Sequence, residues 1–202
     1  MEVRGAQIAE TRTSPQGTQA ALLDIPGLVL LAPRFFGDAR GYFLETYHQA
    51  RYAEFGIHAS FEQDNLSFSA RGVLRGLHFQ EPQPQAKLVS VVAGEVFDVA
   101  VDVRHGSPTF GRWAGVHLTG ENRWQFFVPK GFAHGFCVLS ETAYFSYKCD
   151  GYYAPAHEQA VHWADPDLAI AWPVTTPSLS AKDQAGIRLR DFPVAKLPAY
   201  KI

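Results

Sequence analysis

The sequence predicts an all-β domain, a sandwich or barrel of many short antiparallel strands in which helices are marginal. Three observations indicate this. From Leu28 onward the apolar runs are short, and turn-forming Gly, Pro and Asn residues separate them. Residues 95–103 alternate in character, as a strand with two different faces does. The chain has 202 residues, 47% of them hydrophobic, which is enough for the core of one soluble domain.

The elements follow in order along the chain. Residues 1–23 are rich in Thr, Gln, Ser and Gly, and we expect a mobile extension there. The main domain is expected over 24–190, with a short helix at 48–56 before Gly56 and a helical turn at 179–186. A tail follows at 191–202. Strands are predicted at 27–33, 42–47, 73–80, 87–92, 95–103, 112–119, 125–129, 135–140 and 143–149.

Charge and composition exclude several classes of protein. The net charge is −2 and no basic stripe is present, so no nucleic-acid partner is expected. The N-terminus is polar, and no segment approaches the roughly 20 apolar residues that cross a bilayer, so we expect a cytoplasmic protein. Cys137 and Cys149 lack metal-site spacing and are expected to be reduced thiols, with a disulfide as the alternative.

The strand at 95–103 has one apolar face and one that carries Asp98 and Asp102. Carboxylates are unusual on the core face of a sandwich. The second face either lines a polar cavity or faces solvent, and the alternation alone fits both.

The strand 73–80, "VLRGLHFQ", places Arg75 and His78 among apolar residues. Their odd spacing points them to opposite faces of a regular strand, but a bulge at Gly76 would bring both toward one cavity. An imidazole with an ordinary pKa of about 6.5 is a suitable general base. The alternative is a core histidine satisfied by its neighbours.

A metal site is not expected. Metal-binding cupin barrels use a His-x-His pair, whereas residues 78–80 read His-Phe-Gln. His78 and His134 alone fall short of the three protein ligands that catalytic zinc typically keeps. No dinucleotide or P-loop motif is present either.

Other polar residues have both a chemical and an ordinary interpretation. Tyr147, Tyr152 or Tyr153 could donate a proton, but tyrosine is also a common strand residue. Lys87 could hold an enolate oxygen or be merely solvated. Arg40 and Glu45 by themselves suggest only an ion pair at a sheet edge.

Taken together, several segments resemble the signature blocks of the dTDP-4-dehydrorhamnose 3,5-epimerase family. They span roughly residues 24–185 and read "FFGDARGYFLETY", "QDNLSFSARGVLRGLHFQ", "KLVSVVAGEVFDVAVDVRHGSPTFGRW", "VPKGFAHGFCVLSE", "SYKCDGYYAP" and "LSAKD". The resemblance implies a cupin-like jelly roll that works as a homodimer, without metal or cofactor. It also implies inversion of C3 and C5 of dTDP-4-keto-6-deoxyglucose through an enolate.

The resemblance also implies roles for individual residues. His78 would be the base, Asp183 its paired carboxylate and Tyr147 the proton donor. Contacts with the sugar and diphosphate would come from Arg75, Lys87, His134, Glu158 and Lys182. The nucleotide would be bound by Arg40, Phe43, Glu45, Gln63, Asp64, Asn65 and Tyr153, with Phe43 and Tyr153 stacking on thymine. The N-terminal strands of the neighbouring subunit would complete each site.

Three rival functions stay open at this point. The nearest is a mono-epimerase that inverts only C3 or only C5 in a secondary-metabolite pathway, because such relatives share the base and the tyrosine. The others are a metal-dependent cupin such as a dioxygenase and a non-catalytic module that binds sugar nucleotides.

Overall fold

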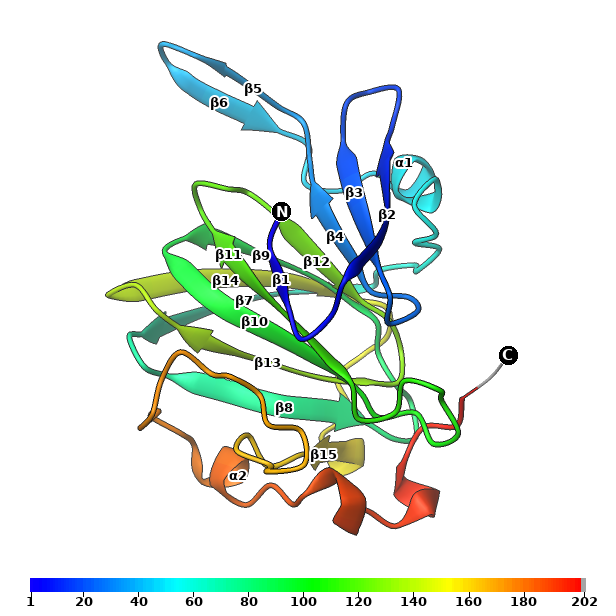
Figure 1. Ribbon diagram of the computed structural model, residues 1–202. Coiled ribbons are helices and arrows are strands. Elements are labelled where there is room, and N and C mark those ends of the chain that lie inside the picture. Colours follow the sequence, from blue (N-terminus) through cyan, green and yellow to red (C-terminus); the bar gives the residue numbers. More distant parts are fainter. Residues whose placement is uncertain (201–202) are drawn as a thin grey trace.

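In the computed structural model, which describes residues 1–200, two antiparallel sheets face each other (Figure 1). The six-stranded sheet has the order β1 (Val3–Arg4), β11 (Trp113–Thr119), β10 (Glu95–Asp102), β13 (Phe132–Val138), β8 (Leu74–Gln80) and β15 (Glu158–Ala160). The seven-stranded sheet has the order β2 (Ile8–Thr13), β3 (Gln19–Leu23), β4 (Val29–Ala32), β12 (Gln125–Val128), β9 (Lys87–Ala93), β14 (Thr142–Cys149) and β7 (Gln63–Ala70). The predicted all-β, cupin-like sandwich is confirmed.

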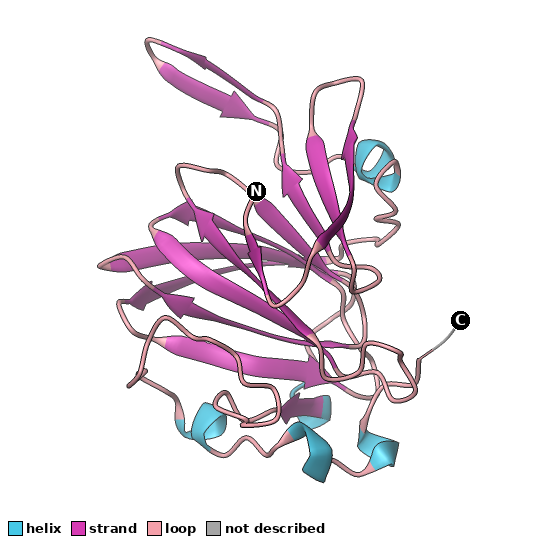
Figure 2. Cartoon of the chain, viewed as in Figure 1, coloured by secondary structure: helices cyan, strands magenta, loops and turns pink. Residues whose placement is uncertain are grey.

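The helices are few and short, as Figure 2 shows. In residues 1–200 they are α1 (Gln49–Ala53) and α2 (Ala181–Gln184), both within the predicted helical segments, together with three 3-10 turns at Pro155–His157, Leu189–Asp191 and Val194–Lys196. Within residues 1–200, every helix is too short to cross a membrane. Residues 201–202 of the predicted tail lie outside the described residues.

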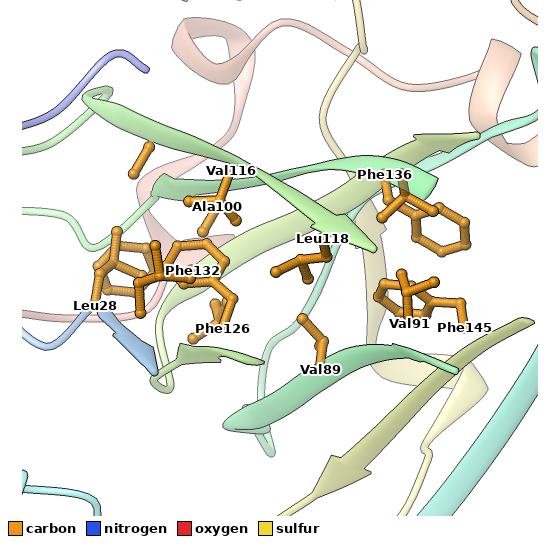
Figure 3. Close-up of a cluster of buried hydrophobic side chains, with 14 of the residues drawn as sticks. Leu28, Val89, Val91, Ala100, Val116, Leu118, Phe126, Phe132, Phe136 and Phe145 are labelled. Atoms are coloured by element: carbon orange, nitrogen blue, oxygen red, sulfur yellow. The ribbon is translucent and has the colours of Figure 1, made fainter. Parts of the chain in front are cut away.

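The main core fills the space between the two sheets, where both contribute large apolar side chains (Figure 3). Phe136 on β13 and Phe145 on β14 stack across this space with ring centroids 4.1 Å apart. Stacked rings of this kind add to the free energy gained from apolar burial. The pair therefore ties the sheets together beside the region where polar side chains replace apolar ones.

A second core lies on the other face of the six-stranded sheet. There Val99 and Val101 of β10 pack against Leu189 and Phe192 of the C-terminal segment, which runs beneath β8 in Figure 1. Both faces of β10 are therefore buried, and Asp98 lies on the face between the sheets. The solvent-facing alternative for the carboxylate face is wrong.

The N-terminal segment corrects the expectation of a mobile extension. Strand β1 pairs with β11, and β2 and β3 extend the seven-stranded sheet next to β4. The side chains of β2 are all exposed, so the strand is held mainly by backbone hydrogen bonds, which leave little trace in the sequence. Ala21 and Leu23 of β3 are buried in the main core.

Two further differences concern strands near the candidate site. The strand predicted at 42–47 is the shorter β6 (Gly41–Leu44), which pairs with β5 (Phe35–Asp38) in a hairpin that projects from the sandwich (Figure 1). Strand β7 was not predicted. Apart from Asp64, its polar side chains face inward, whereas its apolar Leu66 and Phe68 face outward, the reverse of the usual pattern.

Candidate active site

A cavity of about 400 Å³ opens between the sheets beyond the Phe136–Phe145 stack. Its walls come from both sheets and from the segment around α2. Among the predicted site residues, those that line it are Gln63, Asn65, Arg75, His78, Lys87, His134, Tyr147, Tyr153, Glu158, Lys182 and Asp183.

A bulge in β8 brings Arg75 and His78 to the same cavity. His78 pairs with His134 and Arg75 with Phe136, so three steps along β8 oppose two along β13. Gly76 makes this possible with a φ of +119°, and a Cβ at Gly76 would lie 2.5 Å from the Cα of Gly135. Only glycine suits that backbone and that approach. The predicted bulge is confirmed.

His78 is held by Asp183 on α2. The Nε2 atom of His78 lies 2.7 Å from Oδ1 of Asp183, at an angle away from that of an ideal hydrogen bond. The other oxygen, Oδ2, accepts hydrogen bonds from the hydroxyl and the N–H of Ser180, at 2.5 and 3.2 Å, in a capping box at the start of α2. The Gly76 N–H donates to Oδ1 at 3.1 Å, which ties the carboxylate to the bulge.

These contacts decide the charge of Asp183. Burial opposes ionisation, but the contacts from His78, Ser180 and Gly76 outweigh it and hold the pKa of Asp183 well below its usual range. The carboxylate is therefore ionised at neutral pH. A fixed anion beside an imidazole orients the ring and stabilises the imidazolium that forms when the ring takes a proton.

The second ring nitrogen of His78 faces another carboxylate. Its Nδ1 atom lies 3.5 Å from Oε1 of Glu158 on β15, the neighbouring strand. The other oxygen of Glu158 contacts the ammonium of Lys182 and accepts a hydrogen bond of 2.5 Å from the hydroxyl of Tyr153. Burial raises the pKa of Glu158, but Lys182 and Tyr153 outweigh it and the net shift is downward.

Three more cationic or imidazole side chains line the cavity. His134 is buried, and its Nε2 lies 2.9 Å from Oδ2 of Asp98, which is fully buried behind it. Arg75 donates from Nε to the hydroxyl of Ser69 at 3.1 Å, which fixes its direction. Burial lowers the pKa of Lys87, against the opposing charges around it.

Tyr147 enters the cavity from the opposite sheet. It lies on β14, two residues from Phe145 and from Cys149, and all three side chains line the cavity because alternate strand residues share a face. Burial raises the pKa of Tyr147, with Arg75 opposing that shift. The phenol is therefore protonated at neutral pH and able to donate a proton.

Four predicted site residues lie outside this cavity within the single chain. Arg40, Phe43 and Glu45 belong to the projecting hairpin or directly follow it, and Asp64 points outward from β7 to Lys148, 2.9 Å away. The expected ion pair between Arg40 and Glu45 is wrong. Arg40 instead pairs with Asp38, and Glu45 pairs with Arg51 at 2.6 Å.

The cavity also contains residues that were not predicted as site residues. Ser67 and Cys149 follow Asn65 and Tyr147 by two positions on their strands, so strand alternation was the available signal. Cys137 and Cys149 are both buried and unbonded, as expected for free thiols. Within residues 1–200, no three His, Cys, Asp or Glu side chains are grouped so that they could hold a metal ion.

Comparisons with known proteins identify the family of this chain. Residues 22–191 match the family model for dTDP-4-dehydrorhamnose 3,5-epimerase. A dTDP-4-dehydrorhamnose 3,5-epimerase of Pseudomonas aeruginosa is 54% identical over 175 residues, covering 86% of this chain and 97% of the relative. A dTDP-4-dehydrorhamnose 3-epimerase of Streptomyces niveus is 46% identical, covering 88% and 87% of the two chains.

A solved structure has the same fold. The dTDP-6-deoxy-D-glucose-3,5-epimerase of Legionella pneumophila, crystallised with dTDP-4-keto-L-rhamnose, superimposes with a TM-score of 0.89 at 52% identity. The match covers 92% of this chain and all of that one. Sequence, fold and cavity thus agree, and the chain belongs to the dTDP-4-dehydrorhamnose 3,5-epimerase family.

Proposed function

We propose that this protein inverts C3 and C5 of dTDP-4-keto-6-deoxyglucose to give dTDP-4-keto-L-rhamnose. The observation that supports this best is the placement of a carboxylate-backed imidazole and a protonated phenol on facing sheets of one cavity. Inversion of a carbon requires removal of a proton from one side of the sugar ring and delivery of a proton to the other side.

The chemistry starts from the C4 ketone, which acidifies the hydrogens on C3 and C5. His78 takes a proton through the nitrogen that Asp183 does not hold, and the C–H electron pair moves into an enolate. The developing oxyanion is stabilised by the cation of Lys87, with Arg75 as a second donor. Tyr147 then protonates the same carbon from the opposite side. The phenolate regains a proton from solvent and His78 releases its own, so the net reaction is an isomerisation.

The sugar and the diphosphate would contact His134, Glu158, Lys182 and the guanidinium of Arg75. The planar donor fork of arginine suits phosphate oxygens. Gln63 and Asn65 line the cavity wall on β7, and Tyr153 lies at its exposed rim, where it could stack on thymine. We propose no metal and no cofactor for this reaction.

We also propose that the protein is a homodimer in which the hairpin of one subunit completes the cavity of the other. Phe36 and Phe43 on the hairpin are 55% and 69% exposed. Exposure of neighbouring large apolar side chains to water is unusual in a monomer. Leu66, Phe68 and Tyr144 form a second exposed apolar group on the outer face of β7 and β14. The partner's hairpin would supply Arg40, Phe43 and Glu45 to the nucleotide, with Asp64 nearby. The free thiols are typical of the cytoplasm, where we place the reaction.

The test is a reaction with dTDP-4-keto-6-deoxyglucose in heavy water, followed by NMR. The double epimerase incorporates deuterium at C3 and C5 and yields the L-rhamno product. The mono-epimerase is the second candidate, because the Streptomyces niveus relative is a 3-epimerase. Deuterium at only one carbon would favour it and exclude double inversion.

A further inference from the structure

The catalytic imidazole lies between two carboxylates that are held in different ways. Asp183 contacts Nε2 at 2.7 Å and is itself fixed by Ser180 and Gly76. Glu158 faces Nδ1 at 3.5 Å, and its side chain is only 9% exposed. Two anions around one imidazole favour the imidazolium, which cannot accept a proton from substrate.

Lys182 offsets the second anion. Its ammonium contacts the oxygen of Glu158 that points away from His78, and it also lies 3.5 Å from the hydroxyl of Tyr153. Lys182 is half-exposed whereas Glu158 is buried, so the cation covers the anion from the solvent side. Lys182 and Asp183 are adjacent on α2, so one helical turn supplies the carboxylate that contacts His78 and the ammonium that contacts Glu158.

We propose that Glu158 and Lys182 are positioning residues that set how readily His78 binds a proton, Glu158 favouring and Lys182 opposing the imidazolium. The inference rests on the proposed function in that it takes His78 as the base. It adds to the sugar contacts proposed above a role for both residues in the free enzyme.

Of the remaining groups around His78, the Tyr153 hydroxyl contacts both Glu158 and Lys182. Asp183 and the Tyr153 hydroxyl are described above, and the other titratable or charged groups of the cavity are Arg75, Lys87, His134, Tyr147 and Cys149. Asp98 lies behind His134 at 2.9 Å. Substitution of Glu158 or Lys182 removes a contact of the Tyr153 hydroxyl, so Tyr153→Phe is measured beside the two variants to separate its effect on His78 from that of the pair.

The experiment follows the imidazole of His78 by NMR in the full-length, histidine-labelled, substrate-free protein, with His78→Asn to identify its signal. Glu158→Gln removes an anion and is expected to lower the titration midpoint of His78 by about one pH unit. Lys182→Met leaves Glu158 uncompensated and is expected to raise that midpoint by about half a unit. The acidic limb of the kcat/KM profile should move in the same two directions.

The double variant Glu158→Gln/Lys182→Met is the decisive comparison. If the two charges act by balance, the titration midpoint of His78 in the double variant lies between the midpoints of the single variants. If the residues have a purely structural role, the second substitution does not offset the shift caused by the first. Lys196→Met, which removes an exposed lysine far along the C-terminal segment, serves as the control of equal charge and should leave the midpoint unchanged. Shifts in the same direction, or none in either single variant, would overturn the proposal. Wild-type protein without turnover would instead count against the proposed function, and the titration would still decide the charge balance.

Discussion

His78 and Tyr147 line the same cavity from opposite sheets, His78 from β8 and Tyr147 from β14. The packed core between the sheets, including the Phe136–Phe145 stack, fixes the separation of these two side chains. A substrate ring between them would present one face to the imidazole and the other to the phenol.

Tyr147→Phe should separate proton removal from inversion. The imidazole still forms the enolate, so deuterium from heavy water should enter at one carbon or more. Delivery from the opposite side is lost, and the yield of inverted product should fall about 100-fold or further. NMR of the recovered sugar nucleotide measures both. Loss of all exchange would contradict a role as donor alone. Tyr152→Phe, on an exposed side chain, is the matched control and should behave as wild type.

Asp183→Asn should weaken the base without removing it. An amide keeps the shape of the side chain but no longer stabilises an imidazolium, so kcat should fall by a factor of about 100 or more. KM should change much less if Asp183 acts only through His78. Asp167→Asn breaks an exposed ion pair with Arg190 and is the control. Steady-state kinetics with unaltered kcat in Asp183→Asn would be incompatible with the assignment.

The same carboxylate should make stability depend on pH in acid. The pKa of Asp183 is held below its usual range in the folded state, so the unfolded chain binds more protons as the pH falls. Its stabilising contribution is therefore complete above about pH 5 and is lost progressively below about pH 4, the range of an ordinary aspartate. The difference in free energy of unfolding between wild type and Asp183→Asn should shrink from pH 6 to pH 3. Urea unfolding at each pH measures it, and a constant difference would refute the linkage.

Gly76→Ala tests the bulge. The new methyl group would meet Gly135 and the His134 carbonyl within 2.6 Å, on a backbone that L-residues rarely adopt. We expect a loss of roughly 3 kcal/mol in the free energy of unfolding, together with loss of activity. Gly72→Ala also has a positive φ, +77°, but open space around the new Cβ, so it should cost only about 1 kcal/mol. If urea unfolding gave the same loss of free energy for Gly76→Ala and Gly72→Ala, the close approach of β8 to β13 at Gly76 would not matter for stability.

Mixing two inactive variants tests the shared site. His78→Asn disables the cavity of its own subunit, and Arg40→Ala/Phe43→Ala disables the projecting hairpin. If the hairpin acts on the partner, a heterodimer of the two contains one site with all groups intact and one with neither set. Activity should therefore return when the variants are unfolded and refolded together. Persistent inactivity of a verified heterodimer would place the hairpin residues outside the partner's site.

Local sequence patterns were enough to predict strands β9 and β10 and the bulge at Gly76. The alternation at 95–103 and the apolar run at 87–92 correspond to β10 and β9, because most of the apolar side chains in both strands are buried. The odd spacing of Arg75 and His78 around Gly76 indicated the bulge, since a glycine marks close backbone approach. The catalytic roles proposed for His78, Tyr147 and Asp183 came from the family resemblance and not from a local pattern.

What the sequence did not predict depends on tertiary contacts. Strand β2 is exposed on both faces, so its pairing with β3 has no hydrophobic pattern. Strand β7 carries apolar residues on its outer face and polar ones inward, which inverts the rule used to recognise strands. The placement of Glu158 against His78 arises because β15, far along the chain, pairs with β8. No local pattern encodes such a contact.

The long C-terminal segment that covers β10 also delivers Asp183 to the Gly76 bulge. Every strand of the two sheets precedes α2 in the sequence, so a chain that ended before α2 would keep its strands but lack the carboxylate beside its imidazole. It would also lose Leu189 and Phe192, which cover one face of β10. Loss of the C-terminal segment would therefore affect both the proposed base and the packing of the sheet that carries it.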